Sequence, residues 1–248
     1  MAITFLVDQP GLPGMCPIAD AVERLANDSD HSERGAIFTR REVVDFMLDL
    51  AGYTADRPLH QMRLLEPSFG GGEFLLAAVE RLLVAFKSAG GNGDLADCIR
   101  AVELHGNTYR ETRAEVIGLL ERSGLGPAES RRLGDCWLVH GDFLLSALPG
   151  QFHFIVGNPP YVRQELIPPA LLAEYRRRYA SLYDRADLSC RSLSAHLVCW
   201  RRVGNSRSFA LTAGRRTNMA GRFAPSWRRD STFGPMWTWW THPPSIQT

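Results

Sequence analysis

A stiff polar corner follows an apolar segment in residues 152–162, which read FHFIVGNPPYV. The corner itself, Asn158-Pro159-Pro160-Tyr161, joins an amide, two imino acids and an aromatic ring. Consecutive prolines fix the backbone and remove two N–H donors, so their carbonyls can face a ligand. The Asn158 oxygen and the Pro159 carbonyl can accept hydrogen bonds from an exocyclic amine, and Tyr161 offers a face for stacking. The alternative is a proline-rich β-turn without chemistry.

A glycine-rich turn precedes this corner in the chain. Residues 62–65 form a short apolar segment typical of a strand, residues 66–74 read EPSFGGGEF, and residues 75–86 have a helical pattern. Glycines let a backbone approach a ligand closely, and the start of a helix offers unpaired N–H groups. Strand, glycine turn and helix favour a nucleotide site, although a plain tight turn is the alternative and the spacing is not that of the dinucleotide fingerprint.

Two further predicted strands, residues 101–104 and 136–139, are associated with acidic residues. Glu103 could accept hydrogen bonds from both hydroxyls of a ribose. Asp142 could accept one from the amino group of an adenine, against whose ring Phe143 could pack. The structural alternatives are a solvated acid for Glu103 and a helix N-cap for Asp142.

Strands and helices alternate through this part of the chain, with one more helix predicted over about residues 40–50. Such alternation predicts an α/β fold with a parallel sheet and crossover helices. Ligands of such sheets bind outside the carboxyl ends of the strands. We therefore expect the glycine turn, the acids and the proline corner at one edge of the sheet.

In this order the segments resemble the N6-adenine DNA methyltransferases with the gamma motif order, which include stand-alone type II and type IIG enzymes. The matching segments are GAIFTRREVVDFML at 35–48, LLEPSFGGGEFL at 64–75, VELH at 102–105, HGDFLL at 140–145 and FHFIVGNPPYV at 152–162. The resemblance covers roughly residues 34–188. It implies a Rossmann-like class I methyltransferase sheet, S-adenosylmethionine as the cofactor, and double-stranded DNA with a flipped adenine as the partner, within a restriction-modification system.

The resemblance also assigns roles to individual residues. The catalytic residues, which would grip the target adenine, are Asn158, Pro159, Pro160 and Tyr161. The residues that would bind the cofactor are Phe38, Thr39, Glu66, Pro67, Gly70, Gly72, Glu103, Asp142 and Phe143. Within this set Thr39 would contact the methionine carboxylate and Glu103 the ribose. No metal is implied. Arg40, Gly71 and His153 depart from the residues usual at their positions in the family.

Three alternatives to this function stay open. Protein-glutamine methyltransferases and RNA adenine methyltransferases use similar motifs, but the segment GAIFTRREVV upstream of the first strand is a feature of the DNA group. The third alternative is a non-catalytic remnant of such an enzyme.

Composition favours a cytoplasmic protein. The sequence has no run of 18 apolar residues, and its first residues lack the basic and hydrophobic regions of a signal peptide, so we expect neither a membrane protein nor an exported one. The five cysteines lack CxxC spacing and indicate neither a zinc site nor a disulfide framework.

The chain changes character near residue 188. Residues 1–188 carry 19 basic and 26 acidic residues, whereas residues 189–248 carry nine arginines, one acid and five of the six tryptophans. We expect a lead-in over 1–33, a partial catalytic domain over 34–188 that is incomplete at its C-terminal side, and a disordered tail over 189–248, without a target-recognition domain. A basic, aromatic tail that binds single strands is the alternative for the last segment.

A shifted reading frame would explain the change. The codons of residues 236–241, MWTWWT, are almost fixed, and their third bases force the pattern V-D-x-V-D. With suitable codons, the whole tail can be read in that frame as a helix, a turn and a strand, the order that the family requires. Loss of one base beside the Leu188 codon would suffice.

We predict that the nucleotide sequence holds a second open frame running from codon 188 past codon 248. Sequencing the gene across this region tests the prediction. A stop codon in that frame soon after codon 188 would contradict it.

Overall fold

The computed structural model describes residues 16–27, 39–158, 167–178 and 209–212. Its elements are listed in chain order: α1 (Pro17–Asn27), α2 (Arg41–Leu50), the 3-10 turn η1 (Leu59–Gln61), β1 (Leu64–Glu66), α3 (Glu73–Ser88), β2 (Ile99–Glu103), α4 (Gly106–Arg122), α5 (Pro127–Trp137), β3 (Leu138–His140), β4 (Phe154–Gly157), α6 (Pro169–Arg178) and β5 (Phe209–Thr212). Within these ranges, none of the helices combines the length and the apolar character that a membrane span needs.

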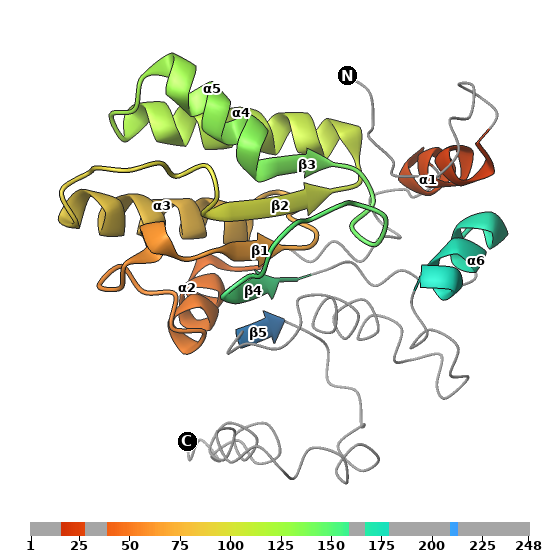
Figure 1. The fold of residues 1–248 in the computed structure, drawn as a ribbon, viewed down its shortest axis with the longest axis horizontal. Coiled ribbons are helices and arrows are strands. Elements are labelled where there is room, and N and C mark those ends of the chain that lie inside the picture. The colour runs from red at the N-terminus through yellow and green to blue at the C-terminus, as the bar shows by residue number, and fades with distance from the viewer. Residues whose placement is uncertain (1–15, 28–38, 159–166, 179–208, 213–248) are drawn as a thin grey trace, which may run out of the picture. The chain divides into compact units, whose positions relative to one another are not determined.

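The strands form one parallel sheet in the order β3-β2-β1-β4-β5 (Figure 1). Leu64 of β1 lies level with Ile99 of β2 on one side and with Phe154 of β4 on the other. The chain adds β2 and β3 on one side of β1 and then returns to place β4 on the other. The strand order therefore reverses between β1 and β4, which is the switch point where open α/β sheets bind ligands.

This sheet confirms the predicted Rossmann-like α/β fold. The predicted helix over about residues 40–50 is α2, and the predicted strands correspond to β1, β2, β3 and β4 with shifts of a few residues. Strand β5, whose four residues pair with β4, was not predicted and lies inside the segment expected to be disordered. Helix α1 within the lead-in was not predicted either.

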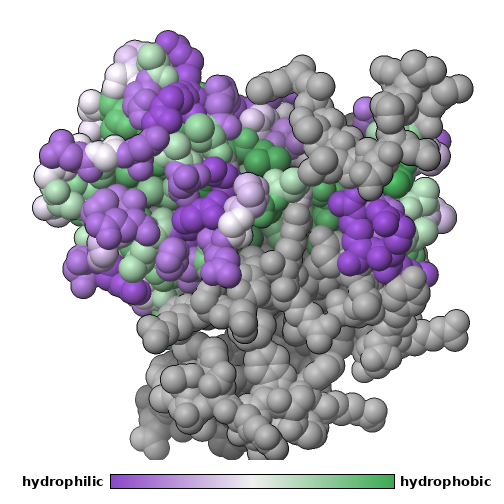
Figure 2. Space-filling view, in the orientation of Figure 1, coloured by the Kyte–Doolittle hydropathy of each residue, from purple (hydrophilic) through white to green (hydrophobic). Residues whose placement is uncertain are grey.

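The two faces of the sheet carry apolar clusters of different size. Leu64, Phe154 and Val156 belong to a large cluster that includes buried side chains from α2, α3, α4 and α5. Leu65 and Ile155 point to the opposite face, where they join Phe152 in a small cluster. Because neighbouring strand residues alternate between faces and both sets are buried, the strands read as continuous apolar runs in the sequence. On the outside, Figure 2 shows hydrophilic and hydrophobic residues interspersed over the described surface.

Helix α2 is fastened to α3 both by packing and by charge. Val44, Met47 and Leu48 are buried at helical spacing on one face of α2. Arg81 of α3 donates to Asp45 at 3.1 Å and to Asp49 at 2.5 Å, both on α2. These ion pairs are partly exposed and such pairs contribute little free energy on their own, so apolar packing supplies most of the stability of the contact between α2 and α3. The result is a fixed position for the start of α2, next to Thr39.

The glycine turn joins β1 to α3 with two residues in the left-handed region. Gly70 has φ 50° and Gly72, which precedes the first residue of α3, has φ 86°. A Cβ added to Gly72 would lie 2.6 Å from Thr112 Cγ2 of α4, whereas a Cβ added to Gly70 would meet no atom of the described residues within 4 Å. Gly72 therefore allows α4 to pack under the turn, and Gly70 keeps the space above the turn open.

We predict that Gly72→Ala destabilises the protein more than Gly70→Ala does. Both alanines must adopt a left-handed backbone at a cost of about 1–2 kcal/mol. Only Gly72→Ala adds a clash with Thr112, which costs roughly another 1–3 kcal/mol. Urea unfolding followed by circular dichroism gives the two free energies of unfolding. Equal losses, or a larger loss for Gly70→Ala, would contradict the packing described here.

Candidate functional site

Asn158, the first residue of the proline corner, lies beside the end of β1 at the switch point of the sheet. Glu66 is the last residue of β1, and Gly157 is the last residue of the neighbouring β4. Gly157 has φ 150°, and a Cβ added to it would lie 3.4 Å from Glu66 Cγ. Asn158, directly after Gly157, therefore lies beside the end of β1. Glu66 and Asn158, which are distant along the chain, thus lie at one edge of the sheet.

A third segment reaches the same place from the start of α2. The Asn158 amide nitrogen donates to Thr39 Oγ1 at 3.3 Å, across 119 residues of sequence. Thr39 is half-buried, and the next residue, Arg40, is the exposed N-cap of α2. Four of the predicted site residues lie outside the described part of the chain: Phe38, Pro159, Pro160 and Tyr161.

Glu66 is a buried carboxylate at the centre of this arrangement. Its side chain belongs to a residue that is 1% exposed, and its Oε2 atom has no hydrogen-bond partner among the described residues. Burial, and next the charges of Glu73 and Glu103, raise the pKa of Glu66 well above its ordinary value. A buried acceptor of this kind is costly unless a donor arrives. Glu66 is therefore suited to receive a cationic or N–H group of a ligand.

Glu103, at the end of β2, holds the glycine turn in place. Its Oε2 atom accepts a hydrogen bond from the Gly70 N–H at 2.9 Å, and its Oε1 atom accepts one from the His105 N–H at 2.8 Å. Glu103 is 2% exposed, so it is not the solvated strand-end acid of the structural alternative. Each carboxylate oxygen has a second lone pair, so Glu103 keeps acceptor capacity for hydroxyl groups.

Thr112 is a part of the site that the sequence analysis missed. Its hydroxyl donates to the Gly70 carbonyl at 2.9 Å, so the two peptide groups that flank the Gly70 Cα are fixed, one by Glu103 and the other by Thr112. Thr112 is buried at helical spacing with Val116 and Leu120 of α4. A polar residue on an otherwise apolar helix face was the signal that could have found it.

Asp142 lies one strand further along, after β3. Its Oδ1 atom accepts a hydrogen bond from the Leu145 N–H at 3.1 Å, which is the capping geometry of the structural alternative. Its Oδ2 atom accepts one from the Tyr175 hydroxyl of α6. Burial raises the pKa of Asp142 despite these donors. Phe143, the next residue, packs against the small apolar cluster on the second face of the sheet.

Pro67 is the remaining predicted site residue that the structure describes. It packs against its neighbours, and so do the two histidines near the strand ends, His105 and His140. Pro67 Cδ lies 3.7 Å from the position of a Cβ added to Gly157. A ring nitrogen of His105 lies 3.0 Å from the Ala26 carbonyl of α1. The His140 ring packs against Tyr109 with 5.2 Å between centroids. His153, at the other edge of the sheet, accepts a hydrogen bond from the Arg63 N–H at 2.9 Å.

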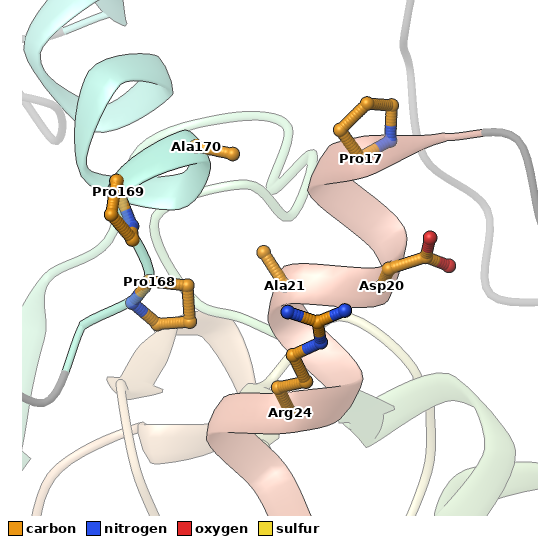
Figure 3. A pocket seen from close by; sticks show the side chains of 7 residues that line it. All are labelled: Pro17, Asp20, Ala21, Arg24, Pro168, Pro169 and Ala170. Atoms are coloured by element: carbon orange, nitrogen blue, oxygen red, sulfur yellow. The ribbon is translucent and has the colours of Figure 1, made fainter.

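A hollow of about 330 Å³ lies elsewhere, between α1 and α6 (Figure 3). It is lined by Pro17, Asp20, Ala21, Arg24, Pro168, Pro169 and Ala170. None of the residues predicted to be functional is among them, and neither of its two charged residues is buried. Buried ionisable groups gather instead at the strand ends, so the chemistry is assigned there.

The strand ends carry three buried acidic side chains. Glu66 and Glu103 end β1 and β2, and Asp142 follows β3, so the three belong to adjacent strands. The Gly70 N–H is bonded to Glu103, which joins the glycine turn to this group. Buried negative charge favours a ligand that carries positive charge and several donors. An amino acid sulfonium with a nucleoside meets this description, since it offers an ammonium, a sulfonium, two hydroxyls and an aromatic amine.

Comparison with known proteins places the chain beside three methyltransferases. It is 56% identical over 201 residues to Type II methyltransferase M.PaeR7I of Pseudomonas aeruginosa, with 79% of this chain and 35% of the relative covered. It is 53% identical to M.XhoI of Xanthomonas vasicola, with 63% and 30% covered, and 43% identical to M.BstVI of Geobacillus stearothermophilus, with 64% and 30% covered. No protein-family model matches the chain.

These identities extend over most of the chain but over a limited part of the relatives. The chain spans about one third of the length of the curated relatives that it matches. At 43–56% identity, the chain is similar to Type II methyltransferases, and its parallel sheet has the Rossmann-like form predicted for such a protein.

Proposed function

We propose that this chain is the cofactor-binding part of a DNA methyltransferase that modifies the N6 amino group of adenine within a restriction-modification system. The methyl donor is S-adenosylmethionine, which supplies an electrophilic methyl group on a sulfonium. The observation that carries the proposal is the meeting of Thr39, Glu66 and Asn158 at the switch point, beside the open glycine turn. The similarity to Type II methyltransferases supports it.

The residues at the strand ends fit this donor. Glu66 would accept a hydrogen bond from the α-ammonium, which offsets the cost of its burial. Glu103 would accept hydrogen bonds from the ribose hydroxyls with its remaining lone pairs. Gly70 and Gly72, with Pro67, let the backbone approach the methionine part.

Further cofactor contacts come from the flanking segments. Thr39, with Phe38 beside it, would bind the methionine carboxylate, and Asp142 and Phe143 would face the adenine ring of the cofactor. Thr39 also accepts the hydrogen bond from Asn158, so the donor and the catalytic corner share a residue. That shared contact would align the two reactants.

The catalytic corner would activate the target nitrogen by geometry. The lone pair of adenine N6 is delocalised into the ring, which makes it a weak nucleophile. The Asn158 oxygen and the Pro159 carbonyl would accept both amino hydrogens and favour a more tetrahedral nitrogen whose lone pair aims at the methyl group. Alignment of this kind removes on the order of 7 kcal/mol or more from a barrier. Pro160 stiffens the corner, and Tyr161 would stack on the base flipped out of the duplex.

We predict that Glu66→Gln stabilises the unliganded protein at pH 8 and weakens cofactor binding. The raised pKa of Glu66 stabilises the fold fully below the ordinary value of 4.5, and this stabilisation is lost as pH rises through the folded-state pKa. A glutamine does not titrate, so its advantage should grow from pH 4 to pH 8. Loss of a charge-assisted hydrogen bond should weaken S-adenosylmethionine binding by about 10- to 100-fold.

Urea unfolding between pH 4 and pH 8 and calorimetric titration measure the two effects. Glu115→Gln, at an exposed position of α4, is the matched control and should change neither. Unchanged cofactor affinity in Glu66→Gln would contradict the role given to Glu66.

We predict that Asn158→Ala lowers transfer of tritium from labelled S-adenosylmethionine to duplex DNA by at least about 100-fold, because a preorganised acceptor is lost. Cofactor affinity should stay within about threefold, since the side chain would act on the target base. The assay uses a protein that continues past residue 188 in the second frame, with the 248-residue chain beside it. We expect the 248-residue chain to bind the cofactor without turnover.

The choice of acceptor in this assay separates the alternatives. Label on DNA supports the proposal. Label only on RNA, or only on a glutamine-containing peptide, would show that the substrate is RNA or protein and not DNA. Undiminished labelling by Asn158→Ala would remove the role of the corner.

A further inference from the structure

Helix α6 contributes a buried tyrosine to the edge of the sheet. Tyr175 is 5% exposed and packs in a cluster with Ala21 and Val22 of α1 and with Leu145 and Leu171. Its hydroxyl donates to Asp142 Oδ2 across 33 residues of sequence. Packing alone needs no hydroxyl, so this donor has an effect on Asp142 that a phenylalanine would not have.

Asp142 is held by this donor and by its own turn. The Leu145 N–H donates to Oδ1 and the Tyr175 hydroxyl donates to Oδ2, so one side of each carboxylate oxygen is bonded to the protein. The preceding residue, Gly141, donates its N–H to the Glu103 carbonyl at 2.9 Å, which fixes the backbone of this turn beside the end of β2. The Leu144 backbone also hydrogen-bonds to this carboxylate. Together these donors set the plane of the carboxylate and the direction of its remaining lone pairs, and Tyr175 is the only one of them that is a side chain.

The Tyr175 hydroxyl also affects the charge of Asp142. Burial raises the pKa of Asp142, and the hydrogen bond from Tyr175 is the largest of the effects that lower it. Removing the hydroxyl would favour the protonated carboxyl group, which is a weaker acceptor.

We propose that Tyr175 is a positioning residue that orients Asp142 as the acceptor for the amino group of the cofactor's adenine ring. The inference rests on the proposed function, because it assumes that a nucleoside occupies the strand ends. Helix α6 follows the proposed catalytic corner in the chain. Through Tyr175 it would help the site to prefer a cofactor whose base carries an amino group.

The test compares two ligands that differ at the amino group of the base. S-adenosylhomocysteine carries that amino group, whereas S-inosylhomocysteine carries a carbonyl oxygen, which cannot donate to Asp142. Calorimetric titration of the 248-residue chain gives the ratio of the two affinities. A merely structural role for Tyr175 would change both affinities together and leave the ratio unchanged.

We expect Tyr175→Phe to lower the preference for S-adenosylhomocysteine by about fivefold or more, as loss of an oriented acceptor implies, with S-inosylhomocysteine affinity within about twofold. In an Asp142→Asn background the same change should leave the preference as it is, because the effect acts through Asp142.

The matched control is Tyr53→Phe. Tyr53 is 1% exposed in the main core, and its hydroxyl has no hydrogen-bond partner among the described residues. The preference should be unchanged in this control.

The outcomes separate this inference from the proposed function. An unchanged preference in Tyr175→Phe overturns the inference while cofactor binding stands. Failure of the unaltered chain to bind either ligand overturns both. Should Tyr175→Phe not fold, Asp142→Ala, which removes the acceptor, decides: a retained preference overturns the inference, because Asp142 would then not be the acceptor that Tyr175 is proposed to orient.

Discussion

The site depends on one buried carboxylate, that of Glu66, which lies out of contact with water at the end of the central strand. Glu66 is buried with Oε2 lacking a hydrogen-bond partner in the described residues, and its acidic neighbours increase the cost of ionising it. A fold tolerates such a group when a ligand supplies the missing donor. The strand order explains its place, since Glu66 ends β1 and the order of the strands reverses between β1 and β4.

The surrounding residues prepare the edge around Glu66 before any ligand binds. Glu103 and Thr112 fix the two sides of Gly70, and Gly72 lets α4 pack beneath the turn. Thr39 and Asn158 join the start of α2 to the end of β4. Preorganisation of this kind lowers the entropy that binding must offset, because the turn needs no rearrangement. The contact between Thr39 and Asn158 would also link the proposed cofactor site to the proposed catalytic corner.

The parts of this arrangement that follow from local sequence were predicted, and those that follow from tertiary contacts were not. Apolar runs, glycines and strand-end acids give β1, β2 and β4 and the edge where they end. Strand β3 begins at Leu138, later than predicted, because α5 extends to Trp137, whose indole N–H donates to the Leu95 carbonyl at 2.8 Å. Helix α1 and the roles of Thr112 and Tyr175 depend on partners far away in the sequence, which single-segment patterns do not encode.

A crystal structure of the chain with S-adenosylhomocysteine would show whether the ligand supplies the donor that Glu66 lacks. We expect the ammonium of the ligand within hydrogen-bond distance of Glu66 Oε2, with the ribose at Glu103. A ligand seated in the hollow between α1 and α6, or at the strand ends with Glu66 still lacking a donor, would contradict this expectation.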